Sequence, residues 1–93
     1  MHATSKQPLV RATLLPNLLK DRGVLQCDIN QETPLRVDLC NTQGRFIRNL
    51  FTASTMEAQR FNLDISGADL PAGVYRLVVS SAAGKVALPF VVF

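Results

Sequence analysis

The stretch from Leu63 to Val79 constrains the fold most, because it contains the end of one strand, a break and the start of another. Over residues 61–65 apolar and polar side chains alternate, which is the two-residue period of a strand with one buried face. Pro71 and Gly73 then favour chain reversal, because proline presets φ and glycine tolerates a positive φ. β-Branched and aromatic residues dominate positions 74–79, as they do in strands. The stretch therefore predicts two strands joined by a tight turn.

Similar runs recur along the chain, separated by residues that favour turns. Gly44 suits the left-handed position of a turn, and residues 81–84 have the composition of a short hairpin turn. We expect residues 18–23 to form a loop or a short helical turn, residues 30–34 a hairpin loop, and residues 52–58 a loop between sheets or a crossing connection. The predicted strands are residues 9–15, 24–29, 35–39, 45–51, 59–65, 74–80 and 85–93.

Seven short strands without a convincing helix predict an all-β protein, a seven-stranded antiparallel Ig-like (Greek-key) β-sandwich. The 93 residues suffice for one small domain, which we place at residues 9–93 after a flexible N-terminal tail at residues 1–8. Hydrophobic residues make up 47% of the chain and charged residues 18%, which is an ordinary globular balance. The first residues lack the apolar core of a signal peptide, so a role outside the cell would make this chain part of a longer precursor.

The net charge is +3, but the ten Lys and Arg residues are scattered along the chain. Nucleic-acid binding usually needs clustered positive charge with stacking aromatic residues, so we expect no nucleic-acid partner and at most a weak attraction to acidic polymers. No run of about 20 apolar residues is present, so no membrane-spanning helix is predicted.

The chain offers no constellation of catalytic side chains. His2 is the only histidine and lies in the tail, so no Ser–His or Cys–His pair is expected in the domain. Cys27 and Cys40 fall on strands expected to be neighbours but on opposite faces, which predicts two free thiols. Asp64 and Asp69 lack the spacing of a calcium loop and are typical turn residues. We therefore predict no catalytic, cofactor-binding or metal-binding residues and no enzyme activity.

The last predicted strand contains Pro89, which cannot donate a backbone hydrogen bond. That strand is therefore expected at a sheet edge, or bulged near Pro89. Residues 86–93 are apolar on both faces, and an open apolar edge can pair with another strand. The chain could form a homodimer through this C-terminal edge strand.

Four short motifs occur in a fixed order along residues 14–93. Their positions are Pro16 and Asn17 after the first strand, then Gly44, Arg45 and Ile47, then Leu70, Pro71, Gly73 and Tyr75, then Gly84, Lys85, Phe90, Val91 and Val92. This order resembles the type A C-terminal sorting domain of type IX secretion substrates. In that family a PNP box is followed by a strand–turn–strand box, a Leu-Pro-x-Gly-x-Tyr box and a short apolar ending.

The resemblance implies that the domain is a secretion address and does no chemistry itself. Such a domain is recognised by the type IX translocon and its shuttle protein, and is often cleaved by a sortase-like peptidase that attaches the cargo to surface lipopolysaccharide. It implies a secreted or cell-surface location, reached through the periplasm and outer membrane as part of a longer precursor. Recognition is expected on the C-terminal strand, at Lys85, Phe90, Val91, Val92 and Phe93.

The alternative is a structural or adhesive Ig-like module that binds carbohydrate or a protein partner on a surface protein. This reading requires an exposed aromatic platform, for which the sequence offers Phe46, Phe51 and Tyr75. Tyr75 is expected mainly to pack its ring in the core and to bond its hydroxyl to a backbone group at a corner of the sandwich. An enzyme is the third reading, and it requires a pocket that gathers two or more titratable groups.

Overall fold

The computed structural model describes residues 10–16, 18–19 and 21–93. These residues form eight strands, and none of them is helical. The strands are β1 (Val10–Leu15), β2 (Leu18–Leu19), β3 (Arg22–Ile29), β4 (Thr33–Asn41), β5 (Phe46–Met56), β6 (Gln59–Ser66), β7 (Gly73–Ser81) and β8 (Gly84–Val92). The predicted tail at residues 1–8 and the motif residue Asn17 lie outside the described part of the chain.

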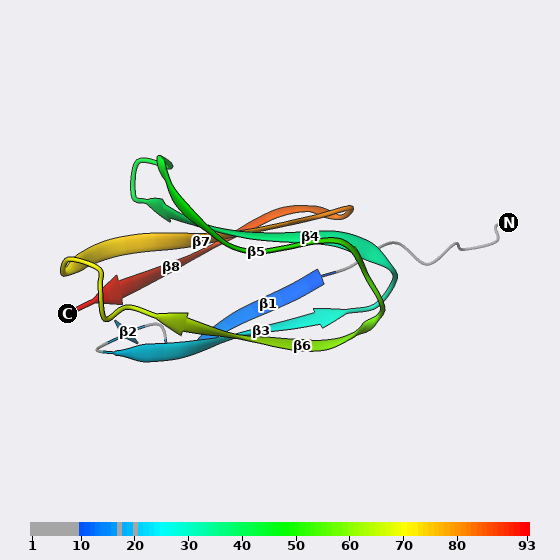
Figure 1. The fold of residues 1–93 in the computed structure, drawn as a ribbon, viewed down its shortest axis with the longest axis horizontal. Helices are drawn as coiled ribbons and strands as arrows, with labels where there is room; N and C mark the ends of the chain where they lie inside the picture. The colour runs from blue at the N-terminus through cyan, green and yellow to red at the C-terminus, as the bar shows by residue number, and fades with distance from the viewer. Residues whose placement is uncertain (1–9, 17, 20) are drawn as a thin grey trace, which may run out of the picture.

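Two sheets pack face to face as a sandwich (Figure 1). One sheet has the order β1-β3-β6 and the other the order β2-β8-β7-β4-β5. All neighbouring strands are antiparallel except β2, which runs parallel to the end of β8. This division of the strands between two sheets is that of an Ig-like Greek-key sandwich. All seven predicted strands are present. No helix in the described residues is long and apolar enough to cross a bilayer.

Two predicted reversals are instead crossings between the sheets. The connection at residues 30–32 leads from β3 in the three-stranded sheet to β4 in the five-stranded sheet, so the predicted hairpin does not exist. The segment at residues 67–72 likewise joins β6 to β7, which do not pair. Its hydrogen-bonded turn precedes Pro71: the Leu70 N–H donates to the Gly67 carbonyl oxygen at 3.1 Å. Alternation predicts which face of a strand is buried, but it does not predict which other strand pairs with it.

Two further predicted loops are partly strand. Residues 18–19, expected in a loop or helical turn, form β2 against the end of β8. β5 continues to Met56, so only residues 57–58 separate it from β6 in the other sheet. The chain therefore changes sheets there through a very short connection, as the crossing alternative predicted.

The two true hairpins join β4 to β5 and β7 to β8. In the first, Gly44 has a φ of +80°, as predicted for its left-handed position. The Asn41 side-chain oxygen accepts hydrogen bonds from the backbone N–H groups of Gln43 and Arg45, at 2.9 Å each. The Asn41 side chain thus supplies the acceptor for two backbone N–H groups within the turn.

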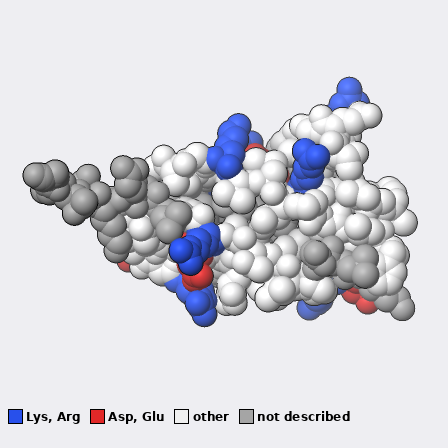
Figure 2. All heavy atoms as spheres, turned by 180° about the vertical axis from the view of Figure 1, so that it is seen from behind, with Lys and Arg blue, Asp and Glu red and all other residues white. Residues whose placement is uncertain are grey.

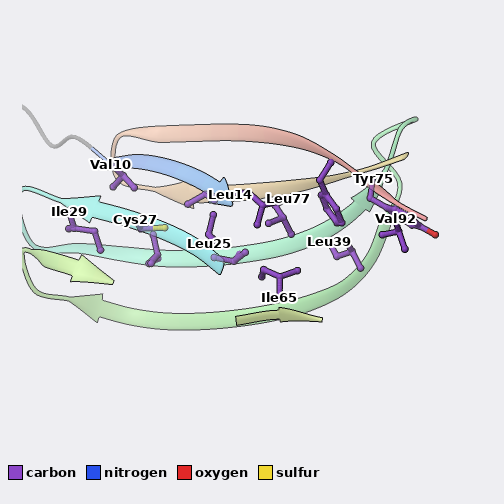
Figure 3. Packing of buried hydrophobic residues seen from close by; sticks show 14 residues of the cluster. Val10, Leu14, Leu25, Cys27, Ile29, Leu39, Ile65, Tyr75, Leu77 and Val92 are labelled. Carbon is purple, nitrogen blue, oxygen red and sulfur yellow. The ribbon is translucent and has the colours of Figure 1, made fainter. Parts of the chain in front are cut away.

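The core lies between the two sheets and is largely aliphatic (Figure 3). Its most deeply buried side chains come from both layers: Leu25, Cys27, Leu35, Val37, Leu77, Val79 and Phe90. Burying one such large apolar side chain contributes about 1.5–3 kcal/mol to stability. Because β3, β4, β7 and β8 all contribute, the core holds the two sheets together.

Candidate recognition surface

Parts of all four motifs meet at one end of the sandwich, whereas Gly84 and Lys85 of the last motif lie at the opposite end, where β8 begins. Pro16 lies between β1 and β2, where the chain leaves one sheet for the other, and β2 pairs Leu18 with Val91 of β8. Gly73 begins β7 directly opposite Val92. Figure 1 shows β2, the C-terminus, the bend before β7 and the tip of the β4–β5 hairpin at this same end, opposite the start of β1.

The Leu-Pro-x-Gly-x-Tyr motif acts as a corner of the fold. The Tyr75 hydroxyl donates a hydrogen bond to the Pro71 carbonyl oxygen at 2.5 Å, and its ring stacks on Phe90 with centroids 5.7 Å apart. Tyr75 is buried, and Leu70 packs against the edge of the core. The expected role of Tyr75 is therefore confirmed, and the motif fixes where β7 begins beside the end of β8.

An ion pair joins the residues that lie next to the second and third motifs. Gly44, Arg45 and Ile47 lie at the β4–β5 hairpin, and Arg48 just beyond them places its guanidinium nitrogen 3.0 Å from an Asp69 carboxylate oxygen. Hydrogen bonding to Arg48, reinforced by its charge, lowers the pKa of Asp69 below its usual range. Both side chains are exposed, so the pair adds little stability. Sequence reasoning treated Asp69 as a turn residue and could not have found Arg48 as its partner.

The structure divides the residues proposed for recognition on the last strand. Phe90 and Val92 are core residues, with 1% and 4% of their surfaces exposed. Val91 is half-buried and is covered at its edge by β2. Phe93 follows the end of β8 and is 61% exposed. Lys85 is exposed as well, but lies near the start of β8, far along the strand from Phe93.

The first part of β8 is an open edge. Among the described residues, β2 pairs only with Val91 and Val92, so the outer side of Gly84–Phe90 has no strand partner. The register between β7 and β8 is unbroken past Pro89, which lies opposite Arg76. Of the two predicted possibilities for Pro89, the edge strand is therefore correct and the bulge is absent.

The outer face of the five-stranded sheet carries exposed apolar side chains. Phe46 is 53% exposed and Val74 is 49% exposed. Cross-strand pairing places Phe46 beside Cys40, and Cys40 beside Arg76. The three-residue aromatic platform is not assembled, because Tyr75 is buried and Phe51 packs against Phe61 with ring centroids 4.6 Å apart.

The outer face of the three-stranded sheet is more polar. Arg11, Asp28 and Arg60 form one row across its strands, and the Arg60 nitrogen lies 2.8 Å from an Asp28 carboxylate oxygen. That hydrogen bond, together with the charge of Asp28, raises the pKa of Arg60. An open hollow of about 310 Å³ is lined by Arg11, Asp28 and Gln59. It gathers two charged groups but no nucleophile, and Asp28 is already held by Arg60.

Both cysteines are free thiols, as predicted, but for a different reason. Cys27 lies opposite Ala12 and Phe61 in the three-stranded sheet, whereas Cys40 lies in the other sheet and outside the core cluster. The assumption that they occupy neighbouring strands was wrong. Burial, reinforced by the charge of Asp28, raises the pKa of the Cys27 thiol to about 11, so it is an unreactive core residue at neutral pH.

Apart from the row formed by Arg11, Asp28 and Arg60, charged and metal-binding groups do not gather in the described part of the molecule. Lys and Arg side chains stand apart on the face seen in Figure 2. No group of three or more His, Cys, Asp or Glu residues that could hold a metal ion occurs within the described ranges. The most distinctive surfaces are thus the motif end, the open edge of β8 and the apolar outer face of the five-stranded sheet.

Comparison of the sequence with known protein families finds no match, and comparison with curated proteins finds none either. A functional assignment therefore has to come from the motif positions and from the surfaces that they build.

Proposed function

We propose that this domain is a non-catalytic C-terminal sorting signal, read by type IX secretion machinery to export a fused cargo and attach it at the cell surface. Its partners would be the translocon, the shuttle protein and the sortase-like peptidase. The resemblance of the four motifs to the type A sorting domain supports this proposal. So does the Ig-like sandwich in which those motifs lie.

The observation that carries the proposal is the meeting, at one end of the fold, of Pro16, the second and third motifs and residues 90–92 of the fourth, whereas Gly84 and Lys85 lie at the other end of β8. Pairing of Leu18 with Val91, pairing of Gly73 with Val92, and the Arg48–Asp69 ion pair bring together segments that are far apart in the sequence. A folded address must present a continuous surface to the machinery that reads it. Side chains exposed at this end are available for that contact.

The test is a reporter enzyme fused before this domain and expressed in a bacterium with type IX machinery. Deletion of residues 90–93 would remove two core side chains and could not separate unfolding from lost recognition. We therefore choose the exposed residues Ile47 and Phe93, which are 38% and 61% exposed. Ile47→Ser with Phe93→Ser should reduce surface display of the reporter about tenfold, equivalent to about 1.4 kcal/mol of lost recognition.

The control is Val86→Ser, which removes a similarly exposed apolar side chain near the start of β8, at the end of the sandwich away from Ile47 and Phe93. It should leave surface display unchanged. Unimpaired display in the Ile47/Phe93 variant, with normal folding by circular dichroism, would contradict the sorting proposal.

A second candidate is the adhesive module, which the apolar outer face of the five-stranded sheet favours. Phe46, Val74 and Arg76 provide apolar contact area with a nearby cation, as protein interfaces often do. A protein partner fits this face better than carbohydrate, because a stacked aromatic platform is missing from it. Two results together would favour this second function. The reporter would be exported equally well without the domain, and the domain would bind a protein partner that the Phe46→Ser variant does not bind.

A further inference from the structure

The open edge of β8 carries an inference beyond secretion. From Gly84 to Leu88 the strand is paired on one side to β7 and has no strand partner on the other side among the described residues. Such an edge presents unpaired N–H and C=O groups that can hydrogen-bond to an added strand. It lies at the opposite end of β8 from Val91 and Val92, which β2 covers.

Pro89 indicates which backbone groups face the open side. Prolines in edge strands direct the nitrogen that lacks a hydrogen toward solvent, because no hydrogen bond to the neighbouring strand is then lost. The unbroken register between Arg76 and Pro89 agrees with this orientation. Because backbone groups alternate along a strand, Lys85 and Ala87 then also direct their N–H and C=O groups outward. The edge therefore offers two consecutive pairing sites and ends at Pro89.

The side chains beside this edge differ between its two faces. Val86 and Leu88 lie opposite the buried residues Val79 and Leu77, so they face the inside of the sandwich, yet Val86 is 37% exposed. Lys85 lies opposite Ser80 on the outer face and forms no ion pair within the described residues. An added strand would therefore place apolar residues on the inner face, against Val86 and Leu88, and could place an acidic residue beside Lys85.

A second copy of this strand fits the edge poorly. Antiparallel pairing centred on Ala87 would set each Lys85 opposite Pro89, which has no N–H to donate. Pairing centred on Val86 avoids the proline but brings the two Lys85 side chains to diagonal positions, where like charges repel. We propose that the open edge of β8 binds an extended segment of another protein, with apolar residues on one side and acidic residues on the other.

The test uses the purified 93-residue chain, labelled with nitrogen-15, and the capped peptide Thr-Glu-Val-Thr-Val-Glu-Thr as a probe. The peptide has acidic residues at both ends of its apolar pair, so it fits either strand direction. Titration should shift the amide resonances of residues 84–88 and leave those of the β5 edge, residues 46–56, unchanged. A peptide of the same composition without the alternation should not bind.

Two variants separate backbone pairing from charge. Ala87→Pro removes the outward N–H and should weaken binding at least about tenfold. Lys85→Glu should weaken binding about fivefold, whereas Arg45→Glu, the same charge change at the β4–β5 hairpin, should change it less than about twofold. The folding of each variant is checked by its amide spectrum.

Three results would overturn the proposal. One is the absence of shifts at residues 84–88 up to millimolar peptide. Another is equal binding by the wild type, Ala87→Pro and Lys85→Glu. The last is concentration-dependent shifts at the same amides without peptide, which would assign the edge to a second copy. Because the measurement needs no export, it can succeed or fail independently of the sorting proposal.

Discussion

The two halves of β8 have similar apolar sequences and opposite surroundings. Residues 90–92 include two core side chains, and β2 covers their outer edge. Residues 84–88 pair with β7 in the same register but are open on their other side, and Val86 on the inner face remains 37% exposed. The same strand therefore contributes stability at one end and leaves an open edge at the other.

The difference arises from what packs against each half. At the closed end, Tyr75 stacks on Phe90 and is itself anchored through its hydroxyl to Pro71. At the open end, the turn before β8 is anchored by Thr33, whose hydroxyl oxygen accepts a hydrogen bond from the Ala82 N–H at 2.8 Å. The closed half is therefore held from several directions, whereas β7 is the one hydrogen-bonded strand neighbour of the open half among the described residues.

The largest expected effect comes from Phe90→Ala in the closed half. Removing a fully buried aromatic ring should lower the free energy of unfolding by about 3–5 kcal/mol, because it also leaves a cavity beside Tyr75. Urea denaturation measures the loss. The size-matched comparison sets Val92→Ala, at a buried position in the closed half, against Val86→Ala in the open half, which should cost less than about 1 kcal/mol. Similar losses for the two valine variants would show that the halves do not differ in packing.

The sequence could predict the strands but not the way they are divided between sheets. Alternation in segments such as residues 61–65 is a local signal, so all seven longer strands were found, together with the buried faces of those at residues 24–29, 35–39 and 59–65. Whether Cys27 pairs with β1 and β6 or with β4 depends on contacts distant in the chain, which alternation does not encode. The prediction of free thiols was correct although its geometry was wrong.

The candidate site was predictable only in part, because local preferences can be read from the sequence and contacts between distant segments cannot. The motif at residues 70–75 could be located and its corner role expected, because proline, glycine and tyrosine have distinct local preferences. The last strand is apolar on both faces, so its sequence does not distinguish the core residue Phe90 from the exposed Phe93. The Arg48–Asp69 pair spans 21 positions and left no sequence signal.

Thr33→Val should affect the open half selectively. Thr33 is 2% exposed, and the substitution leaves the Ala82 N–H without its acceptor at the turn before β8. We expect a loss of about 1–2 kcal/mol in stability. Hydrogen exchange at the amides of residues 82–86 should accelerate more than exchange at Phe90. Uniform acceleration along β8 would mean that the two halves open together.

Tyr75→Phe should have a smaller effect, at the closed end. The substitution keeps the ring that stacks on Phe90 and removes only the hydroxyl bond to the Pro71 carbonyl oxygen. Pro71 is exposed, so water can replace the lost donor, and the cost should be about 1 kcal/mol. Thermal unfolding followed by circular dichroism provides the measurement. A loss above about 3 kcal/mol would mean that the hydroxyl, and not the ring, holds the closed half together.

The smallest effect on stability is expected from Pro89→Ala, at the boundary between the two halves. If the Pro89 nitrogen faces the open side, alanine gains no hydrogen bond to β7. Greater freedom of the unfolded chain should then lower stability by about 0.4–1 kcal/mol. The new outward N–H also extends the pairable edge toward β2, so self-association in sedimentation equilibrium should increase. An increase in stability above about 1 kcal/mol, without association, would place the nitrogen on the β7 side and shift the open backbone groups from Lys85 and Ala87 to Val86 and Leu88.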